Sequence, residues 1–230
     1  MYLFRNFRFA LAWVIAMIGL AMLIVWNSAE YFQSEFTPAF LIEKLPISRN
    51  AIWLTAFRFH VVSACLCFVV GFPLFFPSLL KFRKLHFTLG YIYFNAVLWV
   101  AAPTGLIMSP FAKGGLAAAT GFAVTGLAWW WTTWCGYTAI RRGDVPTHIR
   151  WMVRSFSTAL SAVFFRMIQT GLGWMSVDPE FNYIASVWLS LLASVWLSET
   201  CIGTSWLAIR WPVERYFVRN PVSRFSRRMS

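Results

Sequence analysis

Apolar residues occur along the chain in six long runs that are separated by short polar or basic stretches. The runs cover residues 9–26, 59–80, 86–108, 116–140, 151–175 and 184–209. A hydrocarbon core about 30 Å thick is crossed by roughly 20 helical residues, so each run has the length of a membrane span. Because backbone groups in lipid must be hydrogen-bonded within their own segment, the pattern predicts six transmembrane helices.

The composition leads to the same class of protein. Hydrophobic residues make up 59% of the 230-residue chain, and charged residues make up only 12%. Soluble domains carry roughly 25% charged residues and about half apolar ones. The chain therefore has more apolar surface than a fold in water would bury, which excludes a disordered tail and a water-soluble enzyme. We expect an all-α, polytopic membrane protein that forms a single domain and whose main partner is the lipid bilayer.

The distribution of basic residues sets the expected orientation. The net charge is +12, and fifteen Lys and Arg residues flank the predicted helices on the side of the N-terminus, against four on the other side. Basic residues are enriched on the cytoplasmic side of membrane proteins, so both termini are predicted to be cytoplasmic. This topology explains the excess of positive charge, including a basic tail at residues 210–230, and no nucleic-acid partner is expected. The run at 9–26 lacks a signal-peptide cleavage site and is expected to stay as an anchor.

Ionisable residues at membrane depth are rare because they are costly, and they mark functional sites by default. This chain places His60, His86, His148, Arg166 and Glu199 in or at the ends of its apolar runs. His86 and His148 begin the third and fifth runs, which cross in the same direction, so both are expected near the cytoplasmic face. His60 begins the second run and is expected on the outer side.

The third and fifth runs would be diagonal partners in a four-helix core built from the second to fifth spans. Two histidines at matching depth on diagonal helices have the arrangement that a bis-imidazole haem requires. Small residues on the same helix faces, at Gly90, Ser155 and Ala159, would leave room for a flat macrocycle. Small residues on inner faces also let helices approach closely, which is the alternative interpretation.

Arg166 follows His148 by 18 residues, which is five whole turns of one continuous helix. It is therefore expected to face the bundle interior in the outer half, near His60. There it would bind a cofactor propionate, a carboxylate substrate or a quinone oxygen. The alternative is that Arg166 pairs with Glu199, or with backbone carbonyls, as a structural contact.

Three short strings carry a resemblance to a known family. They are F-H-V-V at 59–62, L-H-F-T-L-G-Y-I-Y at 85–93, and the stretch from R-R-G-D to H-I-R-W-M-V-R-S within 141–155. Together with Arg166, the sequence at about 55–170 resembles a family of predicted bacterial membrane proteins catalogued as domain of unknown function twenty-three-oh-six. The resemblance implies a membrane location and little about activity.

A more distant likeness is richer in mechanism. A His at the start of the second, third and fifth runs is similar to the ascorbate-reducible di-haem b-type cytochromes, which have six helices. In that family the third and fifth spans share one haem, and the second and fourth share the other. The likeness implies haem b between His86 and His148, with His60 as a second-span ligand. No His begins the fourth run at 116–121, so the outer haem would be lost or altered.

The leading expectation is a haem-binding redox protein of the bacterial inner (plasma) membrane that exchanges electrons with a quinone or a small reductant. His86 and His148 would be the axial ligands of the iron, and His60 and Arg166 would line an outer cofactor or substrate site. Whether it is a haem-dependent oxidoreductase, and in which oligomeric state it acts, is left open. The alternative is a non-enzymatic membrane protein, a small transporter or an assembly subunit, that uses Arg166 and Glu199.

Overall fold

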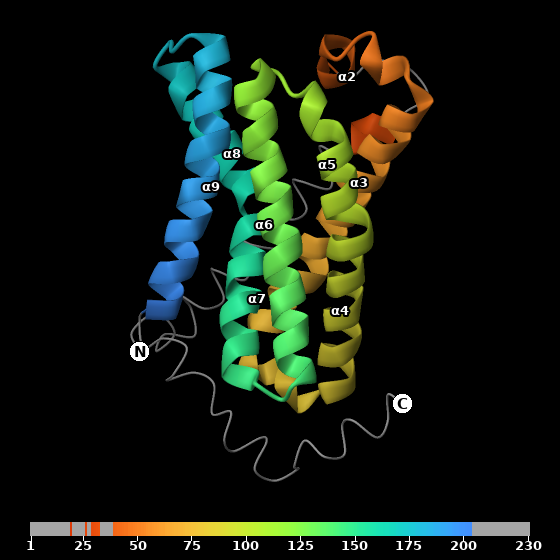
Figure 1. Ribbon diagram of the computed structural model, residues 1–230, viewed down its shortest axis with the longest axis vertical. Coiled ribbons are helices and arrows are strands. Elements are labelled where there is room, and N and C mark those ends of the chain that lie inside the picture. The colour runs from red at the N-terminus through yellow and green to blue at the C-terminus, as the bar shows by residue number, and fades with distance from the viewer. Residues whose placement is uncertain (1–18, 20–25, 27–28, 33–38, 204–230) are drawn as a thin grey trace.

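The computed structural model describes residues 19, 26, 29–32 and 39–203 (Figure 1). Every regular element in this part of the chain is helical, which confirms the all-α class. The long helices run side by side along one axis of the molecule (Figure 1). The predicted first helix at 9–26, apart from two isolated residues, and the basic tail at 210–230 lie outside the described residues.

Six stretches of helix carry the bundle. They are α3 (Ala51–Gly71), α4 (Arg83–Asn95) with its continuations η5 (Ala96–Ala101) and α5 (Ala102–Met108), α6 (Gly115–Arg141), α7 (Val145–Ala159), α8 (Ser161–Trp174) and α9 (Pro179–Gly203). Shorter elements lie between them: η1 (Glu30–Phe32), α2 (Ala39–Glu43), η2 (Ile47–Arg49), η3 (Phe72–Phe75), η4 (Pro77–Lys81) and η6 (Ser109–Phe111).

Within the described residues, three helical stretches are long and apolar enough to cross a membrane. They are Ala51–Phe75, Arg83–Phe111 and Pro179–Gly203, which contain most of the second, third and sixth predicted runs. The fourth run forms α6, whose 27 residues extend about 40 Å at about 1.5 Å per residue. Its Trp, Thr and Gly residues make it less hydrophobic than the other three. The fifth run is divided at Leu160 into α7 and α8, so it is not one continuous helix.

Polar caps set where two of these helices begin. Asn50 accepts hydrogen bonds from the backbone N–H groups of Ile52 (3.0 Å) and Trp53 (3.2 Å), so α3 begins at Ala51. Asp144 caps α7 in the same way, so α7 begins at Val145. A side-chain oxygen at this position satisfies N–H groups that have no partner within the helix. Both helices consequently begin several residues before their apolar runs.

Helices α3 to α7 form a ring. Helix α3 packs against α4, η5 and α5; α5 packs against α6; α6 packs against α7; and α7 returns to α3. This order places α4 and α7 diagonally opposite each other, as the apolar runs predicted. Helices α8 and α9 pack together, and α9 also lies along α6 and α7 (Figure 1).

Helix α9 packs through a row of serines that the sequence analysis did not use. Ser186, Ser190, Ser194 and Ser198 recur every four residues, and each is at most 4% exposed. Ser190, Ser194 and Ser198 donate to backbone carbonyls three residues earlier, so their hydroxyls need no external partner. Small residues at this spacing let transmembrane helices approach closely. The spacing was visible in the sequence and could have predicted which face of this helix is buried.

Candidate functional site

His148 is positioned by the tight turn between α6 and α7. Gly143 ends α6 in the left-handed conformation (φ 78°), where a glycine carries no steric penalty. Asp144 then accepts a hydrogen bond from the backbone N–H of Thr147 (3.1 Å) and begins α7. Hydrogen bonds from Thr147 also lower the pKa of Asp144 below its usual value. The R-R-G-D stretch of the sequence is therefore the turn that places His148 in the first turn of α7.

The ring of His148 is fixed by the backbone of α6. Its Nδ1 lies 2.8 Å from the carbonyl oxygen of Gly136. Because a carbonyl only accepts hydrogen bonds, Nδ1 carries the proton, and Nε2 of the neutral ring keeps its lone pair. Gly136 allows this close approach, since a Cβ there would lie 2.7 Å from the sulfur of Met152. An imidazole held by Nδ1–H to a carbonyl is the usual arrangement of a metal-ligating histidine.

His86 faces His148 from the diagonal helix. It lies in the first turn of α4, at the end of the bundle where α6 and α7 are joined (Figure 1). The two imidazoles are near enough to interact electrostatically. His86 Nδ1 is buried and has no hydrogen-bond partner among the described residues. The two histidines thus lie in the first turns of diagonal helices, and one nitrogen of each ring has no hydrogen-bond partner among the described residues.

A closed set of hydrogen bonds lies directly above this pair, in the centre of the bundle. Tyr93 Oη lies 2.8 Å from Ser155 Oγ and accepts from Trp129 Nε1 (3.1 Å). Ser155 Oγ lies 2.7 Å from Thr133 Oγ1, which is also 2.7 Å from the Trp129 carbonyl oxygen. All four residues are at most 7% exposed. We call them the Tyr93 network.

The direction of every hydrogen bond in the Tyr93 network follows from its two ends. Thr133 has one hydroxyl hydrogen and donates it to a carbonyl, so Ser155 must donate to Thr133. Ser155 then has no hydrogen left for Tyr93, so Tyr93 donates to Ser155 and accepts from the Trp129 indole. Each donor is used once, and the network joins α4, α6 and α7.

The Tyr93 network limits the space available to a cofactor. Tyr93 and Ser155 each lie seven residues after a histidine of the pair, which is about 10 Å along the helix axis. The space beside Ser155 was expected to be open to a macrocycle. It is instead occupied by Tyr93 and Thr133, which both hydrogen-bond to Ser155. Gly90 does face open space, with nothing within 4 Å of the position of a Cβ. Any planar cofactor bound by the pair must therefore lie at the first turns of α4 and α7, below the network.

His60 lies apart from this pair and serves as a contact between helices. Its Nδ1 is 2.8 Å from the Ala101 carbonyl oxygen, at the end of the π-helical turn η5. A Cβ at Gly105 would lie 3.1 Å from His60 Cε1, so the glycine makes room for the ring. The geometry holds α3 against α5 through His60.

The expected position of Arg166 is wrong. Arg166 lies on the exposed side of α8, where Nη1 donates to the Ala162 carbonyl oxygen (3.0 Å). The prediction assumed one continuous helix from His148, whereas the helix is interrupted at Leu160, between α7 and α8. The described structure gives no contact between Arg166 and His60.

Of the two alternative contacts for Arg166, the structure has the one with a backbone carbonyl, whereas Glu199 binds Arg154. The Nε and Nη2 atoms of Arg154 donate to the two carboxylate oxygens of Glu199 at 2.7 and 3.0 Å. The guanidinium also lies over the ring of Trp151, 4.8 Å from its centroid. This two-point contact joins α7 to α9, and the sequence analysis had treated Arg154 only as a topology signal.

Comparison with known proteins gives a family and no activity. A family profile described as "Predicted membrane protein (DUF2306)" matches residues 57–202. The chain belongs to this family. The DUF2306 region contains His60, the His86 and His148 pair and the whole Tyr93 network, so the resemblance noted from the sequence is confirmed. No curated protein and no solved structure matches the chain, and the likeness to b-type cytochromes gains no support from these comparisons.

Proposed function

We propose that this DUF2306 protein is a six-helix protein of the bacterial inner membrane with both termini in the cytoplasm. The family description and the three long apolar helices support the membrane location. The proposal of six spans adds α6, the α7–α8 pair and the run at 9–26. The excess of basic residues on the N-terminal side supports the orientation. The end of the bundle that carries His86 and His148 would then face the cytoplasm.

We propose further that the protein binds haem b and transfers electrons, with His86 and His148 as the axial ligands. The observation that carries this proposal is the pair itself: two neighbouring imidazoles on diagonal helices, one with a buried unpartnered nitrogen and one oriented by a backbone carbonyl. Two such rings can bind the opposite faces of a flat macrocycle. When bound, the haem supplies one-electron redox chemistry.

The residues of the chain supply ligation, orientation and burial. The Gly136 carbonyl fixes the tautomer of His148 so that Nε2 can bind a metal. The Tyr93 network holds α4 and α7 at a fixed separation above the pair. Open space at Gly90 lies on the same helix, one turn from His86. The electron-transfer partner in this proposal is a quinone or a small reductant.

His60 and Arg166 are not included among the ligands. His60 already hydrogen-bonds to the Ala101 carbonyl, and Arg166 lies on the exposed side of α8. The alternative of a transporter or assembly subunit depended on a buried pair of Arg166 and Glu199. Glu199 instead pairs with Arg154, and its side chain is 50% exposed, so no observation favours that alternative.

A visible difference spectrum tests this function. The protein is expressed with haem supply, purified in mild detergent, and measured as dithionite-reduced minus oxidised, beside His86→Ala and His148→Ala. We expect sharp low-spin α and Soret bands in the parent and their loss in both variants. His60→Asn is the matched control, because asparagine can still donate to Ala101 and the bands should remain.

Two results would overturn the haem proposal. One is a folded, monodisperse parent that shows no haem bands. The other is a spectrum that both alanine variants retain, which would place any bound haem elsewhere in the protein.

A further inference from the structure

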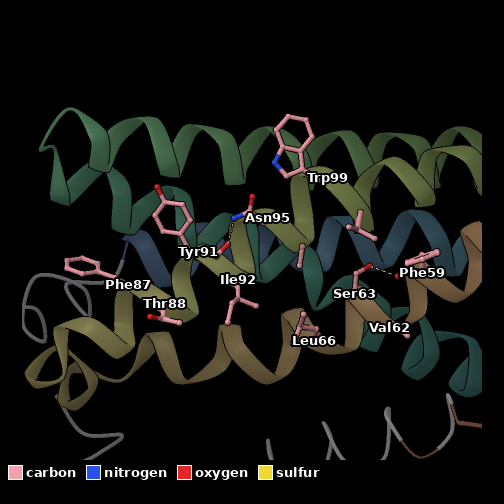
Figure 2. Close-up of a pocket in the computed structure, with 12 residues that line it drawn as sticks. Phe59, Val62, Ser63, Leu66, Phe87, Thr88, Tyr91, Ile92, Asn95 and Trp99 are labelled. Atoms are coloured by element: carbon pink, nitrogen blue, oxygen red, sulfur yellow. Dashed lines mark hydrogen bonds between the residues drawn. The ribbon is translucent and has the colours of Figure 1, made fainter. Parts of the chain in front are cut away.

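A groove lies on the outside of the bundle between α3 and α4, with η5 extending its wall (Figure 2). Its volume is about 750 Å³, which falls within the range of small-molecule sites. Large apolar side chains form its walls, and several of them are strongly exposed, among them Phe59 (59%) and Trp99 (67%). In a bilayer these side chains would face lipid, so the groove opens to the hydrocarbon and not to water.

Asn95 is the amide among the polar side chains of this wall, which also holds the hydroxyl groups of Ser63, Thr88 and Tyr91. It lies 12 residues after Arg83, about 18 Å along the helical stretch Arg83–Phe111, and hence in the middle of that candidate span. One hydrogen of its Nδ2 is donated to the Tyr91 carbonyl oxygen (2.8 Å). The other Nδ2 hydrogen and Oδ1 have no hydrogen-bond partner among the described residues. The side chain is exposed, so both groups are open to a ligand in the groove. A polar group left unpaired in hydrocarbon is costly, so a partner is expected there.

The chemistry of the amide limits what that partner can be. A free N–H donates to a carbonyl oxygen, and a free Oδ1 accepts from a hydroxyl. A hydrocarbon chain satisfies neither group. A lipid-soluble quinone can bind both groups: the carbonyl oxygen of its oxidised form accepts from the N–H, and the hydroxyl of its reduced form donates to Oδ1. Its apolar tail suits the aromatic and aliphatic walls.

The groove also extends to a neighbour of His86. Phe87 lines its end near the α6–α7 turn, and the Phe87 ring lies 6.2 Å from the His86 ring, edge to face. A ligand in the groove would therefore contact a side chain that packs directly against His86.

We propose that this groove binds a membrane quinone, with the amide of Asn95 hydrogen-bonded to an oxygen of the quinone ring. The choice of a redox-active ligand rests on the proposed redox function, whereas the polar group and the apolar walls are features of the groove alone. The competing occupant is a second copy of the chain that pairs Asn95 with its own Asn95, since asparagine also joins helices in membranes.

The test is a titration of the detergent-solubilised protein with decylubiquinone, followed by quenching of tryptophan fluorescence. We expect saturable quenching, with the Kd raised about tenfold in Asn95→Leu, the loss typical of one hydrogen bond. Asn95→Gln keeps the amide and should restore most of the affinity. Thr170→Leu, which removes an exposed hydroxyl from α8, is the matched control and should bind like the parent. Decylbenzene, which has a ring and tail but no oxygen, should bind equally weakly to all variants.

Each opposing result is specific. Equal affinity of the parent and Asn95→Leu, or no saturation, would overturn the quinone site. So would a dimer in sedimentation that Asn95→Leu converts to a monomer, which would assign the groove to a second copy. Haem spectra of the same samples separate the two proposals. Quinone binding without haem bands would refute the histidine site alone, and haem bands without quinone binding would refute the groove alone.

Discussion

Replacing Tyr93 by phenylalanine isolates one hydroxyl at the centre of the bundle. Tyr93 is 1% exposed, and its hydroxyl donates to Ser155 and accepts from the Trp129 indole. The ring is kept in Tyr93→Phe, so the apolar packing of the core is unchanged. Because the direction of each hydrogen bond is fixed, the group left without a partner is the indole N–H of Trp129.

The expected magnitude follows from that unpaired group. A buried donor without an acceptor destabilises a protein by about 1–3 kcal/mol. In membranes the unfolded reference also finds partners, and measured polar contacts average about 0.6 kcal/mol with a maximum near 1.7. We expect Tyr93→Phe to lower the free energy of unfolding by about 1–2 kcal/mol.

A double-mutant cycle with Ser155→Ala tests the directions of the hydrogen bonds. In the Ser155→Ala background the Tyr93 hydroxyl has already lost its acceptor, so removing it should destabilise the protein less. The two changes should therefore be non-additive by about 0.5–1 kcal/mol, as expected for residues in one network.

The assay is unfolding by SDS in mixed micelles, followed by circular dichroism and tryptophan fluorescence. Thr120→Val is the control, because the Thr120 hydroxyl is exposed and bonds only to carbonyls of its own helix at Leu116 and Ala117. Its effect should stay within about 0.5 kcal/mol. A Tyr93→Phe protein as stable as the parent, or strict additivity with Ser155→Ala, would refute the network as described.

Three further predictions concern other contacts of α6, α7 and α9. Glu199→Gln breaks the contact with Arg154, and because both side chains are partly exposed the loss should be at most about 1 kcal/mol in the SDS assay. Gly136→Ala places a Cβ 2.7 Å from the sulfur of Met152, so the Met152 side chain must shift out of the contact between α6 and α7; we expect a loss of about 1 kcal/mol by the same assay. The pKa of Asp144 is lowered from 3.8, so its cap stabilises the protein above that pH and is lost as the pH falls further. The midpoint of SDS unfolding should therefore fall as the pH is lowered below 3.8 in the parent, and this loss from the Asp144 cap should be absent in Asp144→Asn.

The sequence predicted the helices well and their boundaries less well. Apolar runs mark the residues that would lie in hydrocarbon, while helices α3 and α7 begin earlier, at Ala51 and Val145. Both helices are begun by polar caps, Asn50 and Asp144, which lie before the apolar runs. Those caps were readable in the sequence, because Asn and Asp before a helical segment are common start signals.

The position of Arg166 shows where helical periodicity fails. Its predicted face depended on five uninterrupted turns from His148, and the break at Leu160 is marked by neither proline nor glycine. Periodicity alone does not predict such an interruption. By contrast, His86 and His148 lie in the first turns of their helices, so no error in register accumulated before them.

The partner of Glu199 required the tertiary structure. The sequence offers many arginines at similar depth, and only the packing of α9 along α7 selects Arg154. The Tyr93 network was also missed, although Ser155 had been placed on the inner face of its helix and Tyr93 follows His86 at the same spacing as Ser155 follows His148. Their hydroxyl groups, buried on facing helices, were the available signal.

The ratio of haem to protein in the purified chain is the decisive measurement for a haem bound between His86 and His148. We expect one low-spin haem per chain, lost from both His86→Ala and His148→Ala. A folded parent without haem, or two haems per chain, would contradict it.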